Sequence, residues 1–556
     1  MTSTAARAPA GSGSGNRFAR VLDAAARRLG LDRFELAALV VLAGTSLAVL
    51  LPLLTRGRPL SGSDGLFPAD QLQYFAWIRE ASEHGLIGNR FDLAPGDRVF
   101  LHPGLLLSGA LHRVLGISIP LAFLVWKPVA VGVTFAGALA YVRRLVPPGT
   151  RRRAALTIAL FSVMPAAAVV AWTGWGGNPR QFTFDFISGE MWSGQYLWGY
   201  LMTAIAVFLM PLVLLAVERW RREGGSRRLW LAAAGALVVM WLQPWQGATL
   251  ALAIVATEAV EARRSRGRPA WRLGVVVAAA ALPAVYYFLL GELDDAWRLA
   301  AEANAAGGQP EWHWPWWAIV LTVLPLAAPA ALAYRLPAPT WQDVAVRVWP
   351  LAALAVYLQP GGTFPYHAFQ GLALPLGILA VQGVASLRRR PRPALVVAAL
   401  ALLVLPGFAH KVEVAANNVH LGADPYFVFD DEHRALDSLE ADPRPGGVLA
   451  PLYSGFYVPY TTGREVYVGA LSWSPDFRER RRAADALFEG RLRGEPARAF
   501  VRSTRARFLF ADCRRLRDLT GDLRGMLEEV RRFGCATVYV LRERPGMTAA
   551  AGPPDG

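Results

Sequence analysis

Long apolar runs separated by short polar segments dominate the chain up to about residue 408. A helix needs roughly 20 apolar residues to cross a bilayer, because its backbone amides must be satisfied within the helix. The pattern predicts about eleven spans: Leu36–Leu54, Ile119–Val142, Ala154–Trp172, Tyr196–Val217, Leu229–Leu242, Gly247–Val260, Leu273–Leu290, Trp316–Tyr334, Val348–Gln359, Ala368–Leu387 and Ala394–Phe408.

One apolar run is interrupted by polar residues. Gln243-Pro244-Trp245-Gln246 divides the run from Leu229 to Val260, which predicts a hairpin of half-length helices. Broken helices at membrane depth usually line a cavity. Gln243 and Gln246 are therefore candidate substrate-binding residues, although both also suit hydrogen-bonded groups at the membrane interface.

The hydrophobic pattern changes after the last span. Short β-prone runs at Val448–Ala450, Val466–Gly469, Arg507–Asp512 and Ala536–Leu541 alternate with Arg-rich helical stretches. This predicts an α/β domain over residues 409–545, followed by a disordered tail at 546–556. Within it, Ser474-Pro475-Asp476 favours a helix start, with Pro at the first helical position and an end near Gly490.

Arginine placement predicts the orientation of the spans, since short cytoplasmic loops keep an excess of Lys and Arg. Alternate segments between the spans, beginning with residues 1–35, hold 27 arginines, whereas the intervening loops hold seven. Residues 1–35 are therefore expected to form a cytoplasmic basic tail preceding a transmembrane module at 36–408. The loop 55–103 and the α/β domain are expected outside, provided that Leu105–Gly116 re-enters or lies in the interface.

Composition narrows the class of protein. With 54% hydrophobic and 18% charged residues among 556, the chain is too apolar for ordinary soluble domains. The charged residues that give its net charge of +16 lie between the apolar stretches, which argues against nucleic acid as a partner. No GxxxxGK[ST] loop and no dinucleotide fingerprint is present.

The two cysteines, Cys513 and Cys535, suit either a disulfide in an oxidising compartment or two unpaired buried thiols.

The first external loop carries the sharpest group of chemically competent residues. Asp70 begins a predicted amphipathic helix on the membrane surface, where its carboxylate can accept the proton of an attacking hydroxyl group. A simple helix cap is the alternative role for Asp70. Asp64 is a rival base, and the candidate substrate contacts of this loop are Gln71, Tyr74, Arg79 and Arg90.

Further candidates lie in or beside the predicted spans. Lys127 is a cation inside Ile119–Val142, which needs an anionic partner unless it snorkels to the surface. His367 is placed at the outer end of a span, while Arg180 and Glu190 lie in an aromatic-rich external loop. Cations gathered around a carboxylate suit a lipid phosphate at the outer leaflet, because they neutralise the leaving phosphate.

Taken together, these features resemble the GT-C superfamily of membrane glycosyltransferases, which use polyprenyl-phosphate-linked sugars. The resemblance rests on the acidic first loop with Asp64 and Asp70-Gln-Leu-Gln-Tyr74, the span count, the Gln243-Pro-Trp-Gln-Gly247 hairpin, and the C-terminal domain with Thr462-Gly-Arg-Glu-Val-Tyr-Val-Gly469 and Ser474-Pro-Asp476. The adjacent acidic pair typical of the family is absent, because Gln71 follows Asp70.

The resemblance implies an α-helical polytopic membrane protein that performs an inverting glycosyl transfer with the first-loop carboxylate as base. The expected partners are a polyprenyl-phosphate-linked sugar, a glycan, lipid or protein acceptor of the cell envelope, and membrane lipids. No cofactor is required by the sequence, and a divalent metal stays an open option. The alternatives are a transporter or flippase of lipid-linked saccharides and a non-catalytic glycan-binding relative.

Overall fold

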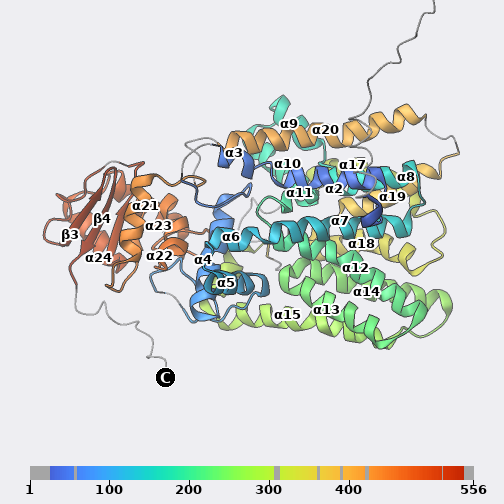
Figure 1. The fold of residues 1–556 in the computed structure, drawn as a ribbon, viewed down its shortest axis with the longest axis horizontal. Helices are drawn as coiled ribbons and strands as arrows, with labels where there is room; N and C mark the ends of the chain where they lie inside the picture. The colour runs from blue at the N-terminus through green and yellow to red at the C-terminus, as the bar shows by residue number, and fades with distance from the viewer. Residues whose placement is uncertain are drawn as a thin grey trace, which may run out of the picture.

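The computed structural model describes residues 26–55, 59–94, 96–305, 314–359, 363–388, 392–419, 425–515 and 517–543. They form a long helical bundle with a smaller α/β domain at one end (Figure 1). The predicted tail at 546–556 and the first 25 residues of the predicted segment 1–35 lie outside the described residues.

Helices make up nearly all of the bundle, as the apolar runs predict. Two of them, α4 and α5, belong to the first long loop and its continuation and lie beside the α/β domain (Figure 1). The elements are α2 Arg33–Ser46, α3 Leu50–Leu54, α4 Pro68–His84, α5 Pro103–Leu115, α6 Ile119–Leu124, α7 Trp126–Leu145, α8 Thr150–Phe161, α9 Ala166–Thr173, α10 Gly177–Met191, α11 Ser193–Tyr196, α12 Leu201–Glu223, α13 Ser226–Leu242, α14 Pro244–Ser265, η1 Trp271–Leu273, α15 Gly274–Leu293, α16 Asp295–Asn304, α17 Trp316–Ala333, α18 Trp341–Tyr357, η3 Pro365–Phe369, α19 Ala373–Ala385 and α20 Pro393–Asn418.

Several of these helices can cross a membrane. By length and composition, five spans qualify among the described residues: Ile119–Leu145, α12, Trp271–Leu293, α17 and α20. The pair α8 and α9, bent by 52° at its break, would make a sixth. The other predicted spans coincide with helices that are shorter or more polar. Leu36–Leu54, for example, is divided between α2 and α3.

The Gln243–Pro244 interruption forms a hairpin, but its helices are longer than predicted. α13 has 17 residues and α14 has 22, and Gln243 alone separates them. Pro244 is the first residue of α14, a position where the missing amide hydrogen costs nothing. Glu258 near the end of α14 lies 2.5 Å from Arg221 at the end of α12, so α14 returns to the end of the bundle where α13 begins.

Arginine-rich segments gather at this same end of the bundle. Arg143 of α7 pairs with Glu35 of α2, and Arg144 pairs with Glu218 of α12. Arg264 continues the series by donating a hydrogen bond to the carbonyl oxygen of Ala338 at 3.0 Å. The α/β domain lies at the opposite end (Figure 1). The arginine-rich segments, which alternate with arginine-poor loops along the sequence, therefore lie together at one end of the fold.

Four strands form the sheet of the α/β domain in the order β1-β2-β4-β3, in which β1 and β2 are parallel and the other pairs antiparallel. Three of the predicted strands are confirmed, whereas Val466 makes only an isolated bridge to Val448. Alternate residues of the strands face α21 and α22 on one side and α23 and α24 on the other. The elements are α21 Asp430–Glu440, β1 Val448–Leu449, α22 Leu452–Thr462, α23 Phe477–Phe488, α24 Gly494–Thr504, β2 Phe508–Ala511, β3 Leu527–Phe533 and β4 Ala536–Leu541.

The helix start predicted at Ser474-Pro475-Asp476 is two residues too early. α23 begins at Phe477, and Asp476 adopts a left-handed backbone with φ of 45° and makes no capping hydrogen bond. The Ser474 hydroxyl instead accepts a hydrogen bond from the Gly469 amide at 2.9 Å. Cys513 and Cys535 form a disulfide in this domain, which decides between the two alternatives for these residues.

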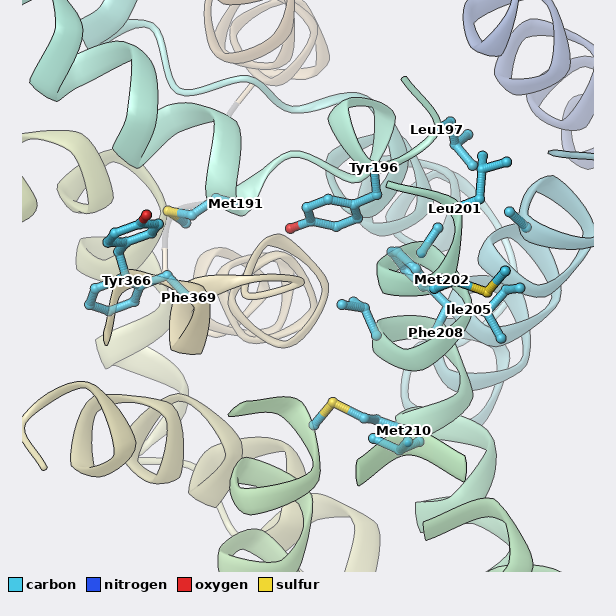
Figure 2. Packing of buried hydrophobic residues seen from close by; sticks show 14 of the residues in the cluster. Met191, Tyr196, Leu197, Leu201, Met202, Ile205, Phe208, Met210, Tyr366 and Phe369 are labelled. Carbon is cyan, nitrogen blue, oxygen red and sulfur yellow. The ribbon is translucent and has the colours of Figure 1, made fainter. Parts of the chain in front are cut away.

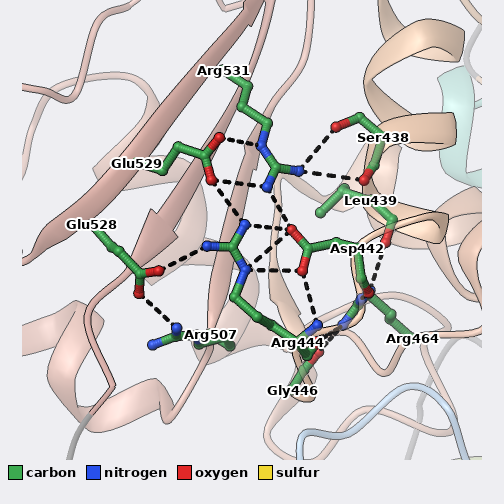
Figure 3. Close-up of polar contacts among 10 residues, drawn as sticks. All are labelled: Ser438, Leu439, Asp442, Arg444, Gly446, Arg464, Arg507, Glu528, Glu529 and Arg531. Carbon is green, nitrogen blue, oxygen red and sulfur yellow. Dashed lines mark hydrogen bonds and ion pairs between the residues drawn. The ribbon is translucent and has the colours of Figure 1, made fainter.

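Strand β3 escapes the sequence pattern because its exposed face is charged. Its side chains Glu529 and Arg531 join a network centred on Arg444 and Asp442 (Figure 3). Asp442 is buried and accepts hydrogen bonds from both arginines at 2.6 Å. This network fixes the edge of the sheet to the loop that follows α21.

A continuous apolar core joins the bundle helices and extends below the sheet. Figure 2 shows part of it, from Met191 and Tyr366 to Leu201, Phe208 and Met210 of α12. The Tyr196 hydroxyl accepts a hydrogen bond from the Gly371 amide at 2.9 Å and donates one to the Glu190 carbonyl oxygen. The end of α10 is thereby fixed to the segment that follows η3.

Candidate functional site

Helix α4 places Asp70 in its first turn, two residues after Pro68. Oδ2 of Asp70 accepts a hydrogen bond from the Tyr200 hydroxyl at 2.7 Å. The helix start has no side-chain capping bond, so the carboxylate is not serving as the cap of α4. Asp70 is accessible to solvent but recessed among protein atoms. Desolvation raises its pKa, against the opposing effects of the Tyr200 hydrogen bond and of the charge on His367.

Asp64, the rival base, is held in a separate buried cluster. Its Oδ2 lies 2.5 Å from Nζ of Lys127, and its Oδ1 accepts a hydrogen bond from the Gln71 side chain at 2.9 Å. Lys127 also donates to the carbonyl oxygens of Ser46 and Leu197. The charges of Asp64 and Lys127 are therefore mutually satisfied inside the protein, and Lys127 does not snorkel to the surface.

A second polar group is built around His367 of η3. Its Nδ1 lies 3.0 Å from Oε2 of Glu190 and 3.0 Å from Nε2 of Gln370. Gln243, at the turn of the α13–α14 hairpin, donates to Oε1 of Gln370 at 2.8 Å, and Gln246 donates to the His367 carbonyl oxygen at 2.7 Å. Four of the candidate residues thus form one connected cluster.

The Asp70 carboxylate and this cluster influence one another. A charged His367 favours the ionised form of Asp70 and lowers its pKa. Tyr74, on the same helix as Asp70, has its pKa raised by burial and by the Asp70 charge. Asp70, Tyr74, Glu190, His367, Gln243 and Gln246 consequently occupy one region, at the end of the bundle away from the arginine-rich segments.

Arg180 lies apart from these contacts in α10. Its guanidinium stacks over the rings of Trp175 at 4.3 Å and Trp317 at 5.3 Å. Stacking of this kind holds an arginine without neutralising its charge. Among the described residues it has no carboxylate partner.

Arg79 and Arg90 join α4 and its loop to the α/β domain. Arg79 contacts Glu440 at 2.8 Å, and Arg90 contacts Glu465 at 2.7 Å. Both also pair with Glu83 of α4. Their charges are matched by carboxylates, whereas the sequence suggested both residues as phosphate contacts.

Two residues of the region were missed at the sequence level. Tyr200 falls within the predicted span Tyr196–Val217, although the preceding Gly199 marks the break before α12. Gln370 is a polar residue within the predicted span Ala368–Leu387. A polar side chain at that position was the sequence signal that could have identified it. Among the described residues, Glu80, Glu83 and His84 form a close group of potential metal ligands that includes neither Asp70 nor Glu190. Asp431 lies close to Cys513 and Cys535, but these sulfurs are joined in a disulfide and supply no thiolate.

The arrangement can accept a proton at Asp70, and its cationic and hydrogen-bonding groups lie partly beside Asp70 and partly apart from it. One oxygen of Asp70 is occupied by Tyr200, which leaves the other to accept a proton from a bound hydroxyl group. His367 and Arg180 supply cationic or hydrogen-bonding groups. Both oxygens of Asp64 are already engaged, by Lys127 and by Gln71.

Comparison with known proteins finds similarity at the level of structure. No protein family and no curated protein sequence matches the chain. Solved structures similar to it include the archaeal oligosaccharyltransferase AglB from Archaeoglobus fulgidus, in complex with an inhibitory peptide and a dolichol-phosphate, at 12% identity and a TM-score of 0.47, over 86% of this chain and 69% of that one. ArnT from Cupriavidus metallidurans bound to undecaprenyl phosphate is also similar, at 12% identity and a TM-score of 0.48, over 93% of this chain and 98% of that one.

Both proteins are GT-C superfamily membrane glycosyltransferases. Because both TM-scores lie below 0.5, the assignment of an activity to this chain depends on its own residues.

Proposed function

We propose that the chain is a membrane glycosyltransferase that moves a sugar from a polyprenyl phosphate to a hydroxyl group of a cell-envelope acceptor. The observation that carries this proposal is the recessed Asp70 carboxylate, which Tyr200 holds by one oxygen close to the Glu190–His367 pair. A desolvated carboxylate with one free oxygen is suited to general base catalysis, since its raised pKa strengthens it as a proton acceptor.

In the proposed reaction, the acceptor hydroxyl group transfers its proton to the free Oδ1 of Asp70. The acceptor oxygen forms a bond to the anomeric carbon of the sugar while the bond from that carbon to the phosphate oxygen breaks. The electron pair of that bond leaves with the polyprenyl phosphate, and the configuration at the anomeric carbon inverts. The remaining candidate contacts for the phosphate are His367 and Arg180, because Lys127 is neutralised by Asp64.

The proposed orientation follows from the two ends of the bundle. The arginine-rich end faces the cytoplasm under the positive-inside rule, which puts Asp70 and the α/β domain outside. A disulfide in the α/β domain is compatible with an oxidising external compartment. The polyprenyl chain of the donor would then lie in the outer leaflet of the membrane.

Asp70→Asn tests this function. Full-length protein in vesicles is supplied with a panel of polyprenyl-phosphate-linked hexoses and pentoses and with an octyl glycoside as acceptor. The wild-type chain is expected to transfer sugar. In the variant, the transfer rate is expected to fall by about 10²- to 10⁴-fold, the usual contribution of a general base. Asp97→Asn, an exposed acid of the same loop, is the matched control. Unchanged transfer by the Asp70 variant would remove this residue from the mechanism.

A further inference from the structure

A surface cavity of about 590 Å³ lies at the arginine-rich end of the bundle, where no part of the proposed transfer takes place. It is formed by the end of α12, the turn into α13 and the connection between α14 and α15. Its lining includes Trp220, Arg221, Ser226, Leu229, Trp271 and Arg272. The cavity is large enough for a small polar group with part of an apolar chain.

The two arginines of the cavity differ in their partners. Arg221 pairs with Glu258, so its charge is largely matched. Arg272 is exposed, lies 5.7 Å from the centroid of the Trp271 ring, and has no carboxylate partner within the part of the chain that the structure describes. The cavity therefore carries a net positive charge centred on Arg272.

The walls of the cavity change from polar to apolar within one helical turn. Ser226 and Arg272 supply polar groups to its lining, whereas Leu229 of α13 and Val275 of α15 supply apolar ones. Trp271 is 79% exposed, and Trp230 and Leu231, next to the lining residue Leu229, are 62% and 59% exposed. Exposed tryptophans next to arginines at the ends of apolar helices are typical of the level of lipid head groups.

We propose that this cavity binds the phosphate head group of an anionic phospholipid from the leaflet at the arginine-rich end. Arg272 pairs with the phosphate, Trp271 covers the glycerol region, and an acyl chain follows the exposed face of α13 at Trp230 and Leu231. An anionic head group is favoured over a zwitterionic one, because the latter carries a cation towards Arg221 and Arg272. This lipid is bound and not consumed.

The test uses the full-length protein in a neutral detergent. Native mass spectrometry counts the molecules of phosphatidylglycerol or phosphatidylcholine retained as each lipid is added. The wild-type chain is expected to retain one phosphatidylglycerol at concentrations at which phosphatidylcholine is lost. Arg272→Gln is expected to weaken phosphatidylglycerol binding about five- to tenfold, the loss of one arginine contact to an anionic head group.

Controls separate this site from general attraction to positive charge. Arg227→Gln removes an exposed arginine of the same end that does not line the cavity, and it should leave phosphatidylglycerol binding unchanged. Equal losses in the Arg227 and Arg272 variants, or equal retention of the two lipids by the wild-type chain, would overturn the proposal. If millimolar inorganic phosphate displaced bound phosphatidylglycerol as effectively as added phosphatidylglycerol does, the cavity would be assigned to free phosphate. This result would also overturn the proposal.

Discussion

Nζ of Lys127 lies 2.5 Å from Oδ2 of Asp64, and this contact distinguishes Asp64 from Asp70, the other candidate base of the first loop. Asp64 is 1% exposed and Lys127 is 4% exposed, so each charge depends on the other. Among the described residues, Asp70 has no such ion pair, and only its Oδ2 accepts a hydrogen bond.

Lys127→Met is therefore expected to destabilise the protein by about 3–5 kcal/mol, the usual effect of leaving one member of a buried ion pair alone. Thermal unfolding in detergent measures the change. The double variant Lys127→Met with Asp64→Asn should recover much of this stability, because no buried charge is then unpaired. A single variant as stable as the wild-type chain would show that the pair is not formed.

Tyr200→Phe tests the positioning of Asp70. The Tyr200 hydrogen bond lowers the pKa of Asp70, so its removal raises that pKa further. Because the base must be ionised, the acid limb of the pH–rate profile for transfer should move to higher pH. We expect transfer at the acid end of the profile to fall about tenfold and to recover as the pH is raised. A uniform loss at every pH would indicate a structural effect instead.

Membrane orientation can be tested with two matched substitutions. Ser503→Cys places a thiol on the exposed surface of α24, and Ser226→Cys places one at the arginine-rich end. A membrane-impermeant maleimide applied to intact cells should label the first variant only, and permeabilised cells should show labelling of both. Cys513 and Cys535 should not react, since they are joined in a disulfide. Labelling of Ser226→Cys alone in intact cells would reverse the proposed orientation.

Acid should weaken the α/β domain through the network of Figure 3. Hydrogen bonds from Arg531 and Arg444 lower the pKa of Glu529 from 4.5 to about 2, and those from Arg444 and Arg531 lower the pKa of Asp442. Groups with lowered folded-state pKa values stabilise the fold above their unfolded pKa values, and this contribution is lost as the pH falls through the folded values. The melting temperature should therefore decrease as the pH falls from about 4.5 to about 2.

Arg444→Gln provides the comparison for this pH dependence. It removes the arginine shared by Asp442, Glu528 and Glu529, so the variant should be less stable at neutral pH and should lose less stability on acidification. Calorimetry of the full-length chain across this range measures both effects. Parallel curves for the variant and the wild-type chain would exclude the network as the cause.

The features predictable from the sequence are those set by local patterns. Apolar runs located most bundle helices, Pro244 located the hairpin turn, and short β-prone runs located β1, β2 and β4. Strand β3 was missed because its charged residues are satisfied by Arg444, which lies far away in the sequence. Helix lengths around Gln243 were underestimated, since a proline at a helix start carries no penalty.

Candidate site residues were identified by type, but their pairing was not predictable. Glu190 and His367 were both expected at the site, yet their contact joins residues 177 positions apart. Asp64 could not be separated from Asp70, because the cation that neutralises it belongs to another helix. Arg79 and Arg90 suited a phosphate until the fold brought Glu440 and Glu465 beside them.

These last contacts couple the two parts of the chain mechanically. The far end of α4 is anchored to the α/β domain through Arg79, while its first turn carries Asp70. α4 is 17 residues long, about 25 Å at the usual helical rise, and connects the α/β domain to the candidate base. Under the proposed function, an acceptor that shifts the α/β domain would therefore also shift the Asp70 carboxylate.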